Sequence, residues 1–162
     1  MADMDPVPIL QKLLTDATGD LPAPPESAIL SHGAPAVDIG VCSLLAVYLQ
    51  SVTPHQLNSN PRVTEGCAIV PQGRFAFQTW RCAPAAMPPG ADTITAASLA
   101  SLTDALAIWD GVVFRRGNGT LLPDGPSAKS ALVSLTPLGP AGGMAGWQLL
   151  LDIELSRPTA TS

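Results

Sequence analysis

The sequence has little charge and few aromatic residues. Of its 162 residues 13% are charged and 4% aromatic, whereas 46% are apolar, and an average soluble domain is about 25% charged. A monomer with so little charge would leave much apolar surface in water, so we expect other subunits or partners to cover part of it. The alternative is a soluble monomer rich in alanine, glycine and proline.

Clustered positive charge is also missing. The net charge is −5, and the eight basic residues are scattered, with Arg115 and Arg116 as the one adjacent pair. Binding to phosphates needs several cations placed together, so we do not expect affinity for nucleic acid.

Export and membrane signals are missing as well. Residues 1–5 are acidic, and no basic stretch is followed by an apolar one. No uninterrupted apolar run approaches the length of a membrane span. We therefore expect a protein of the cytoplasm, or of an assembly built there, with no membrane partner.

Three cysteines in such a chain, Cys42, Cys67 and Cys82, favour reduced thiols. Cys67 and Cys82 would pair only if they lie on neighbouring strands. Otherwise Cys42 and Cys82 are expected to be small buried hydrophobic residues.

No set of residues typical of a catalytic site is present. The two histidines, His32 and His55, do not adjoin a serine or cysteine in a nucleophile motif. No C-x-x-C pair exists to place two zinc ligands. We predict no catalytic residue, no metal site and no cofactor, and hence a protein that is not an enzyme.

The N-terminal part predicts a short helix over residues 6–17, with proline at its start and Gly19 at its end. A proline-rich stretch at 21–26 cannot continue the helix. We divide the chain into an N-terminal helix and linker (1–30), an α+β domain (31–156) and a flexible tail (157–162). Whether the helix docks on its own domain or on a neighbouring subunit is left open.

Alternating apolar residues predict four strands. The first spans 37–50, with a bend near Ser43 and an end at Thr53 and Pro54; the second spans 75–82. The third (131–136) and fourth (147–155) form an antiparallel pair joined by an irregular, glycine-rich connection at 137–146. In the fourth strand, alternate residues from Trp147 to Leu155 face the core, and the polar residues between them face water.

Residues from Thr93 or Thr95 to Arg115 predict the longest helix. Its apolar stripe is expected to cover the sheet and consists of Leu99, Leu102, Leu106, Trp109 and Val113. The fold class is therefore α+β, with an antiparallel or mixed sheet of about four strands packed by one long helix and a short N-terminal helix.

Candidate contact residues lie in three places. The polar loop from residue 55 to 66 lacks apolar periodicity, and Arg115 and Arg116 end the long helix, where we expect them to pair with acidic residues of a neighbouring subunit. Trp80 faces either a second layer of its own chain or another subunit. The predicted subunit or partner interface comprises His55, Gln56, Asn58, Asn60, Arg62, Trp80, Arg115 and Arg116.

A spaced set of motifs carries a family resemblance. These motifs are Cys67, the segment 75–79 followed by Arg81-Cys82-Ala83-Pro84, the helix with Trp109, and the run from Pro137 to Trp147. Over roughly residues 37–155 the sequence resembles tail terminator proteins of long-tailed (siphovirus-type) actinobacterial phages. No functional residue transfers from this resemblance.

The resemblance implies a structural virion protein of the phage tail. It would form a hexameric ring that caps the tail tube at its head-proximal end and joins it to the neck, after assembly in the host cytoplasm. The implied partners are further copies of the chain, the major tail tube protein, and neck or connector proteins, with DNA only passing through the lumen. An acidic protein suits a conduit to which DNA must not adhere.

Two alternatives remain open. One is another head-to-tail connector ring protein, a stopper or adaptor. The other, of a different class, is a cytoplasmic small-molecule-binding or enzymatic domain, which would need a deep pocket holding His55 or Asp38.

Overall fold

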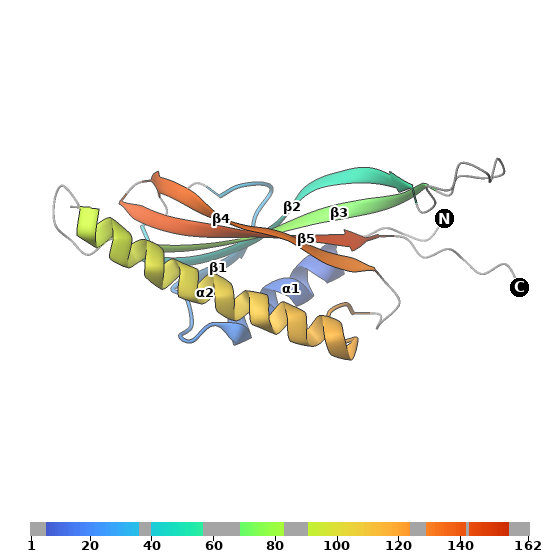
Figure 1. Ribbon diagram of the computed structural model, residues 1–162, viewed down its shortest axis with the longest axis horizontal. Coiled ribbons are helices and arrows are strands. Elements are labelled where there is room, and N and C mark those ends of the chain that lie inside the picture. The colour runs from blue at the N-terminus through green and yellow to red at the C-terminus, as the bar shows by residue number, and fades with distance from the viewer. Residues whose placement is uncertain are drawn as a thin grey trace, which may run out of the picture.

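A computed structural model describes residues 6–35, 40–56, 69–82, 91–123, 129–141 and 143–155. Within these residues the elements are α1 (Val7–Asp20), β1 (Ser27–Leu30), β2 (Ser43–Gln56), β3 (Ile69–Cys82), α2 (Ala91–Asn118), β4 (Ser130–Ala141) and β5 (Met144–Glu154). The strands form one sheet in the order β1-β2-β3-β5-β4, and both helices lie on the same side of it (Figure 1). The predicted α+β class with a long and a short helix is confirmed.

The sheet is mixed and has one strand more than expected. β1 pairs with β2 in parallel, whereas β2 with β3, β3 with β5, and β5 with β4 are antiparallel. β1 falls in the stretch that the sequence suggested to be a linker. It has four residues, which is too short for alternation to reveal a strand.

β3 is longer than the sequence indicated, whereas β2 differs from the prediction at both ends. β2 starts at Ser43, its irregularity lies between Leu49 and Ser51 instead of near Ser43, and it continues past Pro54 to Gln56. Residues 36–39 lie outside the described residues. Pro54 does not end β2. It lies opposite Pro71, in a part of β2 that β1 does not reach, so its other side is an edge of the sheet. Prolines, which lack an N–H group, are tolerated in such edge positions.

The main hydrophobic core lies between the sheet and the two helices. It contains residues of all layers: Leu13 and Ala17 of α1, Ile108 and Val112 of α2, and Leu45, Val47, Phe75, Phe77, Leu149, Leu151 and Ile153 of the sheet. Helix α1 therefore docks on its own chain. The division of the chain at residues 30 and 156 stays a prediction.

Helix α2 turns a different face to the sheet from the one predicted. Its buried residues are Ala97, Ser101, Asp104, Ala105, Ile108 and Val112. Leu99, Leu106 and Val113, which were expected in the core, are 59%, 45% and 48% exposed. Small side chains let the helix backbone come close to the sheet, and polar groups on the buried face find partners there, as described below.

On the sheet face opposite the helices, the polar residues of β5 are less exposed than predicted: Gln148 and Glu154 are half-buried and Asp152 is buried. Asp152 is 8% exposed and accepts two hydrogen bonds from Arg74, at 2.7 and 2.8 Å. Gln148 accepts hydrogen bonds from Tyr48 (3.2 Å) and Gln78 (2.9 Å). Burial raises the pKa of Tyr48, and its hydrogen bond with Gln78 partly offsets this. The polar side chains of this face thus satisfy one another across three strands.

The connection between β4 and β5 is shorter than predicted. β4 runs through Pro137 and Pro140 to Ala141, and β5 starts at Met144. Gly143 has a φ of 74°, a conformation that suits glycine. Gly146 lies against the Trp80 ring, and a Cβ atom at this position would be 2.6 Å from a ring carbon. The glycine-rich run therefore serves a tight hairpin and a close side-chain contact.

Candidate functional site

The β2–β3 hairpin forms an arm that projects beyond the body of the protein (Figure 1). β5 accompanies β3 from Gln72 onward, and β1 accompanies β2 only from Leu44 to Val47. Opposite residues 51–53, β3 still pairs with β5, so the part of β2 and β3 that extends past the end of β5 is the three pairs from Pro54–Pro71 to Gln56–Ile69. Residues 51–54 are all exposed. A two-stranded ribbon is only marginally stable by itself in water, so this arm is a candidate contact element.

The arm carries two of the predicted interface residues. His55 and Gln56 form the end of β2, at its tip. Asn58, Asn60 and Arg62 lie outside the described residues. The polar loop therefore follows the arm directly in sequence, and its role in contacts stays a prediction.

Arg115 joins the two helices of its own chain. It donates hydrogen bonds to both carboxylate oxygens of Asp20, one at 2.8 Å, and its Nε lies 3.4 Å from Asp16 Oδ2. The side chains of Arg115 and Asp20 are both 16% exposed. Hydrogen bonding to Asp20 raises the pKa of Arg115, against the opposing effect of burial. The acidic partners that we expected on a neighbouring subunit are thus found within the chain.

Gly111 makes this ion pair possible. A Cβ atom at position 111 would overlap the Asp20 carboxylate. The end of α1 thus fits closely against α2, and the cluster of Asp16, Asp20 and Arg115 fixes the angle between the helices. Arg116, one residue further, is exposed. The assignment of both arginines to an interface stays a prediction.

The outer face of α2 carries large apolar side chains in water. Leu99, Leu106 and Val113 repeat every seven residues, and Phe114 beside them is 71% exposed. We call these four residues the outer stripe. Residues seven apart lie on the same side of a helix, and the exposed Thr103 and Asp110 lie between them. Exposed apolar side chains grouped on one side of a helix are a candidate interaction site.

Helix α2 is apolar on both sides, and its hydropathy reflects this. An 18-residue window reaches a mean hydropathy of 1.3, so by length and composition α2 could cross a membrane, although 33% of the window is buried inside the protein. One side of α2 packs on the sheet. The expectation of no membrane partner stays a prediction.

Trp80 lies inside its own chain. It is 5% exposed, packs with Leu44 and Met144 in a second small core, and donates a hydrogen bond from its Nε1 to Gln78 Oε1 at 3.1 Å. Its packing partners belong to the same sheet, on the face opposite the helices, so among the described residues no second layer covers Trp80, and its assignment to an interface stays a prediction. Trp80 lies opposite Leu44 near the start of β2, whereas His55 lies at the other end of that strand. The structure therefore does not gather the predicted interface residues into one site.

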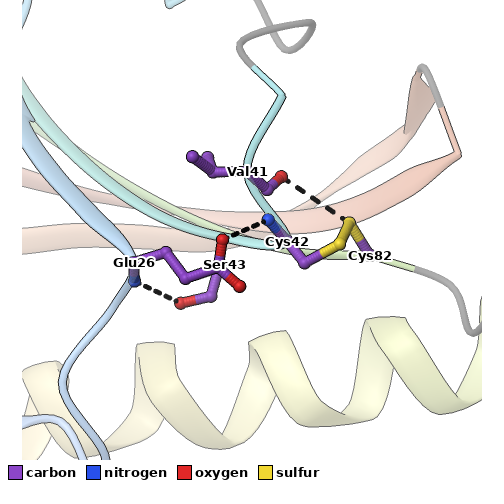
Figure 2. Close-up of a disulfide and its surroundings, with 5 residues drawn as sticks. All are labelled: Glu26, Val41, Cys42, Ser43 and Cys82. Atoms are coloured by element: carbon purple, nitrogen blue, oxygen red, sulfur yellow. Dashed lines mark hydrogen bonds between the residues drawn. A yellow bond between two sulfur atoms is a disulfide. The ribbon is translucent and has the colours of Figure 1, made fainter.

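Cys42 and Cys82 form a disulfide, which corrects the expectation of reduced, buried thiols (Figure 2). Their Cα atoms are 4.6 Å apart because Cys42 precedes β2 directly opposite the last residue of β3. Cys42 is exposed and Cys82 half-buried. The alternative pairing of Cys67 with Cys82 is wrong for this structure, and Cys67 itself lies outside the described residues.

Two polar links between α2 and β3 escaped the sequence analysis. Arg81 donates to both oxygens of Asp104, at 2.7 and 3.1 Å, and this raises its pKa. Ser101 Oγ donates to the Thr79 carbonyl oxygen at 2.6 Å, and Thr79 Oγ1 donates to the Ser101 carbonyl oxygen at 2.9 Å. A polar residue every third or fourth position on one side of an apolar helix was the available signal.

Among the described residues, no three His, Cys, Asp or Glu side chains are grouped so as to hold a metal ion.

Comparisons with known proteins give only remote structural likenesses. No family model matches the chain, and no curated protein matches it in sequence. Among solved structures, the sheath/tube terminator of the extracellular contractile injection system PVC, in its extended state, matches with a TM-score of 0.45 and 10% sequence identity. The match covers 96% of this chain but 58% of that protein. That neighbour is a terminator of a tail-like assembly, and a TM-score at this level carries no argument about the function of this chain.

Proposed function

We propose that the protein is a structural virion protein, a tail terminator that forms a ring, caps the tail tube at its head-proximal end and joins it to the neck. The proposal rests on the resemblance of the sequence to tail terminators of long-tailed actinobacterial phages, together with one structural observation. That observation is the outer stripe of α2. The proposed partners are further copies of the chain, the tail tube protein and neck proteins.

The outer stripe supports an assembling subunit because a monomer would leave it in water. Leu99, Leu106 and Phe114 are between 45% and 71% exposed, although the chain has few charges to offset them. Covering such side chains contributes about 25 cal/mol for each Å² of apolar surface removed from water. A partner that covers the stripe would therefore gain considerable free energy.

The projecting arm supports contacts at a second place. The arm and the outer stripe belong to different elements, so contacts through both would join unlike surfaces of neighbouring copies. Head-to-tail contacts of this kind generate a closed ring when the rotation between copies closes. This arrangement agrees with the hexameric ring that the resemblance implies.

The test is the size and shape of the purified protein. We expect light scattering to give a mass several times that of the 16.6 kDa chain, and electron microscopy to show rings that bind one end of tubes made from the tail tube protein. A variant with Leu106→Glu and Phe114→Glu should remain monomeric and folded, because both side chains are exposed. Its matched control carries two new glutamates on exposed positions of α1, Gln11→Glu and Thr15→Glu, and should still assemble.

Three outcomes would contradict the proposal in different ways. A ring that binds the neck side and never the tube would indicate a stopper or adaptor instead. A wild-type monomer at high concentration would remove the assembly role. Loss of assembly in the control as well as in the stripe variant would show that added charge, and not the stripe, is responsible.

A further inference from the structure

Two oxygen atoms lie next to the cysteines of the disulfide, one from the Glu26 side chain and one from the Val41 backbone (Figure 2). The backbone N–H of Cys42 donates a hydrogen bond to Glu26 Oε2 at 3.0 Å, while the backbone N–H of Glu26 donates to Ser43 Oγ at 3.1 Å. These two bonds hold the Glu26 side chain beside Cys42. The Glu26 carboxylate is therefore anchored to the backbone of the residue that carries the exposed sulfur.

The second sulfur faces a partial negative charge. Cys82 Sγ lies 3.6 Å from the carbonyl oxygen of Val41. The pKa of Arg81 is raised chiefly by its hydrogen bonds with Asp104 and also by the charge of Glu26, so Arg81 offsets part of the Glu26 charge. A thiolate that formed at Cys82 would therefore meet the partial negative charge of the Val41 oxygen.

The two sulfurs differ in access. Cys42 is exposed and Cys82 is half-buried. An attacking thiolate needs a clear path to the sulfur that it attacks, and a leaving thiolate departs more slowly when its surroundings disfavour negative charge. Access thus favours attack at Cys42, and the charges around both sulfurs slow it.

We propose that Cys42–Cys82 is a slowly exchanging redox clasp, in which small thiols attack Cys42 first and the Glu26 carboxylate repels anionic thiols. In reduction, a thiolate bonds to Cys42 Sγ, the bond between the cysteines breaks, and its electron pair leaves with Cys82 Sγ, which takes a proton from water. A second thiolate attacks the added sulfur, releases Cys42 as a thiolate and leaves as a small-molecule disulfide. Closure is the reverse, with a small-molecule disulfide as the oxidant.

The clasp adds a covalent link to a corner of the sheet that hydrogen bonds already hold. It connects the start of β2 to the end of β3 across 40 residues of chain, where the Cys82 N–H also donates to the Cys42 carbonyl oxygen at 2.9 Å, and Glu26 connects the same point to the segment entering β1. Opening the clasp would leave the β2–β3 pairing and the helix-covered core in place. The inference is independent of the proposed role in a tail.

The test compares thiols of different charge. Reduction of the full-length protein, with Cys67→Ser to leave one pair, is timed with cysteamine, 2-mercaptoethanol and 3-mercaptopropionate, whose thiolates carry net charges of 0, −1 and −2. Rates are normalised to the thiolate concentration. For the wild-type pair we expect the rate to fall as the thiol becomes more negative. We expect Glu26→Gln to raise the 3-mercaptopropionate rate about threefold relative to the cysteamine rate at low salt. The difference should shrink in 1 M salt.

The controls separate charge from folding. Glutamine at position 26 keeps a side-chain oxygen to accept the Cys42 N–H bond, and Glu154→Gln removes the same charge at the opposite end of β5, so it should change nothing. Acid quenching followed by peptide mass spectrometry should find the mixed disulfide on Cys42. A mixed disulfide on Cys82, equal charge dependence in wild type and Glu26→Gln, or two free thiols in protein purified in air would each overturn the proposal.

Discussion

The two faces of α2 have similar periodicity and opposite surroundings. The inner face contacts the sheet with small residues such as Ala97, Ser101 and Ala105, which are at most 3% exposed. The outer face presents the larger side chains of Leu106, Val113 and Phe114 to water. The size of a side chain and its hydrogen-bonding partners, and not hydrophobicity alone, therefore decide which face of α2 is buried.

The largest difference in stability is expected when a large aliphatic side chain is removed from each face of α2. Ile108→Ala on the inner face, where the side chain is 0% exposed, should lower the free energy of unfolding by about 3 kcal/mol. Leu106→Ala on the outer face should change it by less than about 0.5 kcal/mol. Urea unfolding of monomeric protein measures both. Equal losses would show that the outer face is also covered within the monomer.

The two adjacent arginines offer a second contrast at the end of α2. Arg115→Gln leaves Asp20 without its cation in a largely buried place, whereas Asp16 keeps Lys12 at 2.6 Å, so the substitution should cost about 2 kcal/mol. Arg116→Gln should cost almost nothing, because the side chain is exposed. Thermal unfolding of both variants tests this. A stable Arg115→Gln variant would show that the helix pair does not depend on the ion cluster.

A smaller effect is expected from the polar link on the inner face. Ser101→Ala removes the hydrogen bond to the Thr79 carbonyl oxygen, which no longer has this partner. The expected loss is about 1 kcal/mol. Thr103→Ala, at an exposed position two residues away, is the control for helix propensity. If both variants lose the same stability, the Ser101 bond contributes nothing of its own.

The smallest effect on stability should come with the largest effect on assembly. Phe114→Ser removes a side chain that is 71% exposed, so the unfolding free energy of the monomer should stay within about 0.5 kcal/mol. Sedimentation should nevertheless show weaker association at equal concentration. Unchanged association would mean that Phe114 lies outside the proposed interface, which would then have to be sought at the arm.

Local patterns of the sequence predicted the elements with strong periodicity. The alternation from Trp147 to Ile153 gave β5 and its core-facing residues, and proline at position 6 marked the start of α1. The orientation of α2 was not predictable from hydropathy, because Ala97, Ser101, Ala105 and Ile108 are spaced as regularly as the leucines. Only the register of the sheet places Thr79 and Arg81 where Ser101 and Asp104 can bond to them.

Contacts between distant segments account for the rest. β1 pairs in parallel with β2, and its four residues are too few to show the apolar alternation that indicates a strand. The disulfide depends on the register that brings Cys42 opposite Cys82, which local patterns do not contain. For the candidate interface, the sequence singled out Arg115 but could not show that its partner lies within the chain, because Asp20 is 95 positions away.

That separation has a consequence for synthesis on the ribosome. Asp20 leaves the ribosome well before Arg115, and at bacterial translation rates of about 5–20 residues per second α1 waits roughly 5–20 seconds for the helix that completes its contacts. During this time the apolar side of α1 has no α2 to pack against. The nascent chain thus passes through a period in which its first helix lacks its partner helix, and β5, which completes the core between β3 and β4, is made later still.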